Sequence, residues 1–260
     1  MIALTHQPSP NMQACERTFV PHLPIDFSLA VRQHAAYCQA LADCGAQVRT
    51  LDVNSALPDC TFIEDTAVVL DEVAILCSMG TPSRQPETLG IEPVLREYRP
   101  LECGNLDSGL RILPPATLEG GDVLRISRRL LVGQSRRTNA AGIAALQAIA
   151  ARFGYLVTSI PVHHSLHLKT ACTALPDGRL LVNPAWIDLR SLADFSVIHI
   201  PAAEPWGANL CLAGRTVLLP AAQVQTAQLV SQLGFAVKPV EISEFSKAEG
   251  GVTCLSLIFE

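Results

Sequence analysis

The sequence predicts an α/β fold, a five-bladed pseudosymmetric α/β propeller in which small ββαβ-type sheets surround a central active-site cavity. Its 260 residues are 49% hydrophobic and only 17% charged, with a mean hydropathy of +0.29, so the chain can bury one large core. A helical pattern with short apolar runs recurs about every fifty residues, a period typical of repeat architectures. We therefore expect one domain over residues 1–260. An ordinary mixed α/β domain with approximate repeats is the alternative.

Five segments carry apolar residues at helical spacing. The clearest begins near Phe27 and stops before Gly45, and glycine is the residue that most often ends a helix. Gly154 and Gly234 follow the third and the fifth segment in the same way. The expected helices cover residues 27–44, 86–98, 139–153, 185–194 and 221–233.

One extended apolar run follows each helix, and two more precede the next helix. Short strands that turn back on themselves favour small sheets over one long parallel sheet. The expected runs after the helices are 47–51, 99–102, 155–162, 196–200 and 236–242. The expected strand pairs are 66–70 with 73–78, 123–126 with 130–133, 170–175 with 179–183, and 210–212 with 216–220. Residues 253–259 and 2–5 would complete the first unit and close the ring.

The charge pattern excludes several classes of partner. The chain has 19 Lys and Arg against 24 Asp and Glu, a net charge of −5, which is too acidic for a surface that tracks nucleic acid. Residues 216–237 lack formal charge, but proline and glutamines interrupt them too often for a membrane span. Residues 1–10 do not resemble a secretory signal. We expect a cytoplasmic protein that binds no nucleic acid and no membrane.

The nine cysteines form no CxxC pair and no metal-ligand spacing, so we expect no metal and no disulfide, and mostly buried thiols. Cys254 is a candidate exception because it follows Gly250 and Gly251, which allow a ligand to approach the backbone closely. A cysteine nucleophile needs a cation or a base beside it. His167, with apolar neighbours and an expected strand directly after it, is the candidate partner. A buried structural cysteine and a core histidine are the alternatives.

Three acidic residues lie at the edges of apolar strands. Glu119 precedes a tight Gly-Gly-Asp turn and could orient a protonated His167 as the third member of a triad. Glu64 and Asp65 are adjacent, and on a strand only one of them could face a given ligand. Carboxylates beside apolar residues are costly unless they meet a cation. The pair is therefore either a capped hairpin or a site for a cationic substrate.

Five segments, taken together and in this order, resemble the dimethylarginine dimethylaminohydrolase family. That family belongs to the guanidine-modifying pentein superfamily, whose fold is a five-bladed α/β propeller. The resemblance implies a hydrolase without metal or cofactor that converts N-ω-methylated arginine to citrulline and an alkylamine through a covalent thiouronium on cysteine. The segments are FIEDTAV (62–68), LEGGD (118–122), VGQSRRTN (132–139), HLK (167–169) and GGVTCLSL (250–257).

The resemblance also implies a role for each matching residue. Glu64 and Asp65 would bind the guanidinium, and an arginine pair would clamp the substrate carboxylate, for which the fork of the guanidinium is suited. The implied catalytic residues are Cys254 as nucleophile, His167 as general acid and base, and Glu119 as the support of His167. The implied substrate-binding residues are Asp59 and the Thr18 carbonyl for the α-amine, Arg84 and Arg137 for the α-carboxylate, Ala248 through its backbone, and Glu64 and Asp65.

Lys169 distinguishes this chain from the deiminases of the superfamily, which resemble one another in having an aspartate two residues after the histidine. Loss of that second carboxylate favours methylated arginine over arginine. Another N-substituted arginine, arginine itself with a deiminase activity, and a non-catalytic propeller that binds a macromolecule are the alternatives. Residues 9–20 are expected to form a flap over the site. The expected partner is a small molecule, and the protein is expected to be a monomer or a homodimer.

Overall fold

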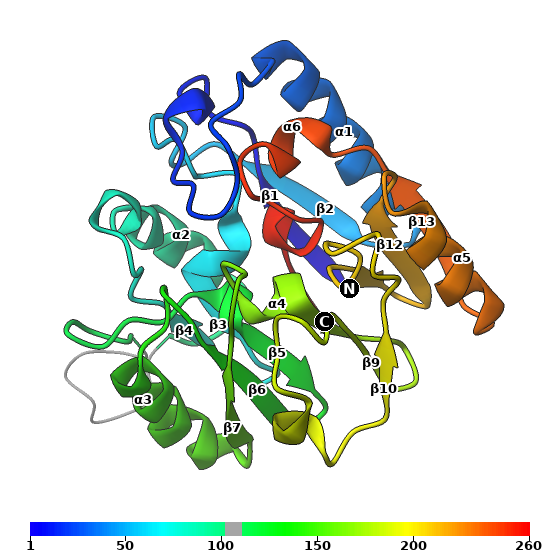
Figure 1. Cartoon of the computed structure of the whole chain (residues 1–260). Coiled ribbons are helices and arrows are strands. Elements are labelled where there is room, and N and C mark those ends of the chain that lie inside the picture. The colour runs from blue at the N-terminus through cyan, green and yellow to red at the C-terminus, as the bar shows by residue number, and fades with distance from the viewer. Residues whose placement is uncertain (102–110) are drawn as a thin grey trace.

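The computed structural model describes residues 1–101 and 111–260, and these residues form five small sheets with helices on their outer sides (Figure 1). The predicted α/β class is confirmed. Among the described residues, no helix combines the length and apolarity needed to cross a membrane. Cys103 lies outside the described residues, and the eight described cysteines are all free thiols.

Four of the sheets share one pattern, in which the middle strand is antiparallel to one neighbour and parallel to the other. The fifth is an antiparallel pair. This repetition explains the recurring apolar runs of the sequence. The sheets are β14 (Ser256–Phe259), β1 (Ile2–His6) and β2 (Gln47–Leu51); β3 (Ala67–Val69) and β4 (Ala74–Leu76); β5 (Val123–Ile126), β6 (Arg129–Gln134) and β7 (Leu156–Pro161); β8 (Cys172–Ala174), β9 (Leu180–Val182) and β10 (Val197–His199); and β11 (Cys211–Ala213), β12 (Thr216–Pro220) and β13 (Ala236–Val240).

The two ends of the chain meet in one sheet, as predicted. Strand β1 pairs antiparallel with β14, with Leu4 opposite Leu257. The amino group of Met1 also lies 2.9 Å from a carboxylate oxygen of Glu260. The segment that carries Cys254 therefore runs directly into a strand held by the start of the chain.

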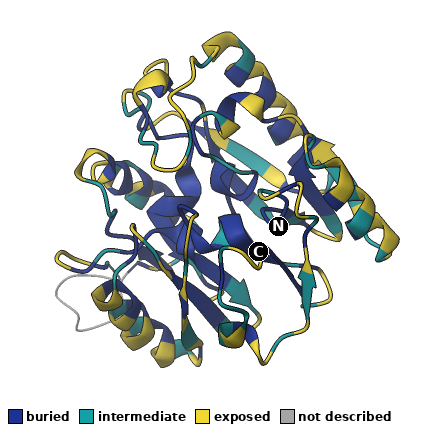
Figure 2. Ribbon diagram, in the orientation of Figure 1, coloured by how far each residue is buried: buried dark blue, intermediate teal, exposed yellow. Residues whose placement is uncertain are grey.

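Helices pack outside the sheets at four of the five predicted places. They are α1 (Phe27–Asp43), α2 (Glu87–Arg96), α3 (Ala140–Ala150) and α5 (Val224–Gln232). The helix predicted over 185–194 was wrong, because only a 3-10 turn at Leu189–Leu192 forms, capped by the side chain of Asp188. Figure 2 shows that the outer helices expose one face while the elements at the centre are buried.

The predicted strand at 99–102 was also wrong for its described residues. Residues 99–101 form no strand, and the only backbone bond toward β4 there is accepted by the Pro100 carbonyl from the amide of Ala74, at 3.2 Å. Proline has no N–H to return to a neighbouring strand. Glu102 lies outside the described residues.

Short helical turns precede the first strand of several sheets and meet at the centre of the molecule. Turn η2 packs against both η4 and η7, and α4 packs against η4. Glu64, Asp65 and Cys254 lie in these turns, and Glu119 and His167 directly precede two of them. Their bounds are η2 (Ile63–Thr66), η4 (Gly120–Asp122), α4 (Leu168–Ala171) and η7 (Thr253–Leu255).

Candidate active site

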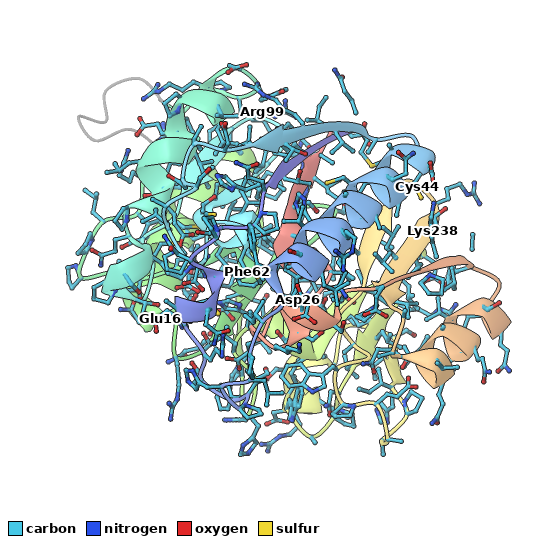
Figure 3. The ribbon with its side chains drawn as sticks, turned by 90° about the horizontal axis from the view of Figure 1, so that it is seen from above. Glu16, Asp26, Cys44, Phe62, Arg99 and Lys238 are labelled. Atoms are coloured by element: carbon cyan, nitrogen blue, oxygen red, sulfur yellow. The ribbon has the colours of Figure 1, made fainter. Side chains whose placement is uncertain are left out.

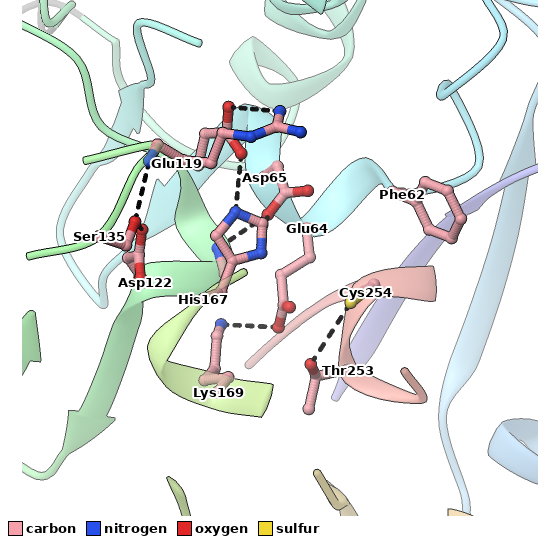
Figure 4. A network of polar contacts seen from close by, with 12 residues as sticks. Phe62, Glu64, Asp65, Glu119, Asp122, Ser135, His167, Lys169, Thr253 and Cys254 are labelled. Atoms are coloured by element: carbon pink, nitrogen blue, oxygen red, sulfur yellow. Dashed lines mark hydrogen bonds and ion pairs between the residues drawn. The ribbon is translucent and has the colours of Figure 1, made fainter. Parts of the chain in front are cut away.

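His167 and Glu119 form a buried hydrogen-bonded pair at this centre (Figure 4). The Nε2 atom of His167 lies 2.7 Å from Oε2 of Glu119, and both side chains are buried. A strand was predicted directly after His167, and this was wrong, because His167 caps the short helix α4. The carboxylate of Asp122 accepts the amide hydrogen of Leu168 at 2.8 Å and holds the first turn of that helix.

His167 is surrounded by carboxylates, and they set its protonation. Its Nδ1 lies 3.7 Å from Oδ1 of Asp65, on the side of the ring opposite Glu119. Burial disfavours the imidazolium, but the charge of Asp65, the hydrogen bond to Glu119 and the charge of Asp122 outweigh burial and raise the pKa of His167 to about 9. At neutral pH the imidazolium therefore carries a proton that it can donate.

Glu64 and Asp65 are both buried in the 3-10 turn η2 and not on a strand, so the prediction that they point to opposite faces of a strand was wrong. Asp65 accepts hydrogen bonds from Nη1 of Arg84 at 2.8 Å and from the amide of Gly121 at 3.0 Å. Burial raises the pKa of a carboxylate, but His167 and Arg84 lower that of Asp65 below its usual value.

Glu64 is less completely neutralised than Asp65. Its Oε1 lies 2.6 Å from Nζ of Lys169, whereas its buried Oε2 has no hydrogen-bond donor among the described residues. Burial raises the pKa of Glu64, and the charge of Lys169 opposes that rise. A buried carboxylate oxygen without a donor is costly, so a bound group with N–H donors and positive charge would stabilise it.

Two glycines let the acidic turn and the histidine approach each other. A Cβ atom on Gly120 would lie 2.0 Å from the carbonyl oxygen of Glu64. A Cβ atom on Gly121 would lie 2.6 Å from both Oδ1 of Asp65 and Nδ1 of His167. Only glycine fits at these positions. The Gly-Gly-Asp motif is therefore a requirement of packing between η2, η4 and His167.

Cys254 lies in η7, on the other side of Glu64 from His167 in Figure 4. Its sulfur accepts the amide hydrogen of Gly251 at 3.4 Å. Burial, and then the charges of Glu64 and Asp65, raise the pKa of the thiol to about 12. At neutral pH the Cys254 thiol is therefore protonated and uncharged.

The two arginines expected at the amino-acid end of a substrate differ in their surroundings. Arg84 is buried, and besides Asp65 it donates to both carboxylate oxygens of Glu87, at 2.9 and 3.0 Å, and to the Phe62 carbonyl. Arg137 contacts the hydroxyl of Thr81 and lies 3.5 Å from Oε1 of Glu119. Arg84 is thus part of the carboxylate network, and it would have to give up a partner to bind a ligand.

Residues of the N-terminal segment, which carries Glu16 in Figure 3, contact two buried carboxylates beside the site. The amide of Glu16 donates to both oxygens of Asp59, at 3.2 Å each. The amides of Thr18 and Phe19 donate to Glu249 at 2.6 and 3.0 Å. Glu249 directly follows Ala248, which is itself buried. Asp59 therefore contacts the segment expected to act as a flap, Thr18 belongs to that segment, and Ala248 directly precedes a residue that contacts it.

Asp65, Glu119 and His167 also have the geometry of a metal site, since one ligand atom of each lies within 4.8 Å of the others. A metal ion there would need the neutral form of His167. It would also lie beside the guanidinium of Arg84, whose Nη1 is 2.8 Å from Oδ2 of Asp65. The Arg84 guanidinium would repel a cation bound to Asp65.

Known proteins similar to this chain include arginine deiminases and dimethylarginine dimethylaminohydrolases. A family model described as arginine deiminase matches residues 53–204. A dimethylarginine dimethylaminohydrolase of Streptomyces coelicolor is 39% identical over 256 residues, which cover 98% of this chain and 95% of that protein. The chain belongs to the dimethylarginine dimethylaminohydrolase family. The Pseudomonas aeruginosa dimethylarginine dimethylaminohydrolase is 33% identical over 234 residues, 90% of each chain.

Solved structures of dimethylarginine dimethylaminohydrolases share the fold over the whole chain. An adduct with S-methyl-L-thiocitrulline matches with a TM-score of 0.90 and 30% identity, covering 99% of this chain and 98% of that one. A Pseudomonas aeruginosa variant complexed with citrulline has a TM-score of 0.89, 29% identity and the same coverage. The predicted family is confirmed, and the protein is a hydrolase that acts on guanidino C–N bonds.

Three buried polar residues of this dimethylarginine dimethylaminohydrolase family member had no role predicted from the sequence. They are Asp122, Asn209 and Glu249. Asp122 lies inside a recognised motif, and Glu249 precedes one, so proximity to the motifs was the available signal. Asn209 stands between the apolar residues Ala208 and Leu210. The feature of the sequence that could have identified Asn209 was its position, because it lies shortly before the first strand of a sheet, as the other site residues do.

Proposed function

We propose that this protein hydrolyses N-ω-methylated arginine, asymmetric dimethylarginine or monomethylarginine, to citrulline and an alkylamine. The observation that carries the proposal is the buried Oε2 of Glu64, which has no donor among the described residues and lies near a cysteine thiol. A guanidinium supplies both the N–H donors and the positive charge that this carboxylate requires. The family membership and the citrulline bound by the Pseudomonas aeruginosa relative support the same substrate class.

In this proposal the guanidinium binds to Glu64 and Asp65. Asp59 and the Thr18 carbonyl bind the α-amine, and the Ala248 backbone contacts the amino-acid end. Arg137 and Arg84 bind the α-carboxylate, for which Arg84 exchanges one of its present partners. The proximity of these residues to the N-terminal segment supports residues 9–20 as the flap.

Binding of the cation activates the nucleophile. Two of the causes that raise the pKa of Cys254 are the charges of Glu64 and Asp65, and a guanidinium between them and the sulfur offsets both. The thiol then loses its proton to solvent, and the thiolate attacks the guanidinium carbon to give a tetrahedral adduct. The attraction between thiolate and guanidinium persists into this step, so binding and activation use the same charges.

His167 then moves the protons. The imidazolium donates its proton to the substituted nitrogen, the C–N bond breaks, and the alkylamine leaves a thiouronium on Cys254. The neutral imidazole accepts a proton from water as the water attacks the same carbon. The hydroxyl of the resulting adduct loses its proton to solvent as the C–S bond breaks, which releases citrulline and restores the thiolate. Glu119 keeps the ring oriented and stabilises its charged form, in agreement with their 2.7 Å contact.

We also propose that the five sheets are the blades of a single closed propeller over residues 1–260. The pairing of β1 with β14 and the meeting of the helical turns at the centre support this arrangement. The site then lies where the blades converge.

The test is citrulline formation from asymmetric dimethylarginine, monomethylarginine and arginine by the wild-type protein and by Cys254→Ser and His167→Asn. We expect citrulline from at least one methylated arginine, and none with either variant. Citrulline from arginine only would assign a deiminase activity instead. No citrulline from any of the three with folded wild-type protein would overturn the proposal. Glu204→Gln, a buried carboxylate change near the start of α5, is the control that should remain active.

A further inference from the structure

The proposed catalytic and guanidinium-binding residues come from four of the five sheets. In each of these sheets they lie just before one strand of the antiparallel pair. Glu64 and Asp65 precede β3, Glu119 precedes β5, His167 precedes β8, and Cys254 precedes β14. The first strand of the remaining sheet is β11, which begins at Cys211, and Asn209 precedes it. Asn209 is only 2% exposed, so its amide is buried among the same central turns.

Every polar group of the Asn209 side chain forms a hydrogen bond, and these bonds connect α4 with η7. Its Nδ2 donates to the carbonyl of Lys169 in α4 at 2.9 Å and to Oγ1 of Thr253 in η7 at 2.9 Å. Its Oδ1 accepts the amide hydrogen of Thr253 at 3.3 Å. Lys169 is two residues after His167, and Thr253 directly precedes Cys254. We infer that Asn209 is a positioning residue that sets the placement of the Cys254 sulfur relative to the His167 imidazole.

The asparagine amide suits this role better than other side chains of similar size. It presents two donors and one acceptor from a short stem, which is the set that one carbonyl, one hydroxyl and one amide require. Aspartate would lose both donors and add a buried negative charge. Leucine would leave three buried polar groups without a partner. The inference rests on the proposed function, because it concerns the same nucleophile and acid.

Gly251 provides an independent observation. A Cβ atom on Gly251 would lie 2.2 Å from Oδ1, 2.5 Å from Cγ and 2.9 Å from Nδ2 of Asn209, so its three nearest neighbours all belong to this one side chain. The amide of Gly251 also donates to the sulfur of Cys254. The second glycine of the Gly-Gly motif is therefore required so that Asn209 can reach the nucleophile turn.

The test combines Asn209→Ala, Gly251→Ala and the double variant. Asn209→Ala should lower kcat on a methylated arginine by about 100-fold, with KM changed much less, because a misplacement of about 1 Å costs about that factor. Gly251→Ala should be at least as damaging in the wild-type background. In the double variant the clashing atoms are gone, so its kcat should equal or exceed that of Gly251→Ala. A double variant that is slower than the wild type by the product of the two single losses would mean that the two residues act independently, and it would overturn the inference.

Asn139→Ala is the matched control for loss of an asparagine that makes three bonds. Its side chain accepts the amides of Gly142 and Thr117 and donates to the carbonyl of Pro115 in the N-cap of α3, so none of its three bonds goes to a proposed catalytic or substrate-binding residue. Asn139→Ala should lower the Tm while kcat stays within about twofold. If Asn209→Ala changes Tm and kcat only as this control does, its role is structural and the inference fails.

A second readout needs no substrate and separates this inference from the proposed function. Iodoacetamide alkylation of Cys254, resolved from the other cysteines by peptide mass spectrometry, should show a changed pH profile in Asn209→Ala and an unchanged one in Asn139→Ala. If the wild type releases no citrulline, the proposed function fails while this profile still tests Asn209. Identical profiles in the wild type and in Asn209→Ala would overturn the positioning role.

Discussion

Replacing Glu64 by glutamine should make the Cys254 thiol of the substrate-free protein more reactive, although it removes a proposed substrate-binding charge. Burial and the charges of Glu64 and Asp65 raise the pKa of this thiol to about 12. At pH 7 a pKa of that size leaves roughly one thiolate in 10⁵ molecules. Glutamine keeps the shape and an acceptor for Lys169 but removes one of the two charges. If the pKa falls by about one unit, or 1.4 kcal/mol, the thiolate fraction rises about tenfold.

The assay is the pseudo-first-order rate of iodoacetamide alkylation at Cys254, read by peptide mass spectrometry at several pH values. Glu64→Gln should raise this rate about tenfold near pH 7 and lower kcat/KM for methylated arginine. Glu204→Gln is the control, since it also replaces a buried carboxylate but one that binds the amides of Gln225 and Thr226. A rate in Glu64→Gln equal to or below that of the wild type would refute the electrostatic reasoning.

Three further outcomes follow from the site. The pKa of His167 is raised to about 9 from an ordinary value of 6.5. Its contribution to stability is therefore complete below about pH 6.5 and is lost as the pH rises through about 9. The urea midpoints of the wild type and of His167→Asn should accordingly converge at alkaline pH. Gly120→Ala, whose Cβ would lie 2.0 Å from the Glu64 carbonyl, should lower the free energy of unfolding by at least about 2 kcal/mol in urea titrations. Glu249→Gln, which presents an amide donor to the Thr18 or Phe19 amide, should raise KM severalfold at similar kcat and speed proteolysis within residues 9–20. An unchanged urea midpoint difference across pH, a Gly120→Ala variant as stable as the wild type, or a Glu249→Gln variant with wild-type KM would each count against the corresponding argument.

The sheets could be predicted from the sequence because apolar runs mark them directly. The pairs β5 with β6 and β11 with β12 lie within a residue or two of the predicted runs. The failures are local. Residues 99–101 form no strand because they include Pro100, which has no N–H to donate to a neighbouring strand. Turn η2 forms because the hydroxyl of Thr66 donates to the carbonyl of Ile63 at 2.7 Å. The two-residue period of a strand pattern does not reveal such a contact.

The candidate site was only partly predictable for a different reason. The residue types and the family resemblance identified Cys254, His167 and Glu119 as candidates, and the structure brings His167 and Glu119 into contact. The pairing of Arg84 with two carboxylates depends on its burial, which sequence spacing does not specify. Asn209 was missed because a buried asparagine between apolar residues looks like part of a strand until its three partners are known.

The pairing of β1 with β14 has a consequence for how this protein acquires its reactivity. The sulfur lies two residues before a strand whose partner is at the opposite extreme of the chain, so the ends must find each other before the thiol has its native surroundings. The pairing of residues 2–5 with residues 256–259 closes a long loop, and the entropic cost of that closure delays it relative to local contacts. A partly folded chain would therefore hold an ordinary cysteine, and guanidine chemistry would begin only after β1 and β14 pair.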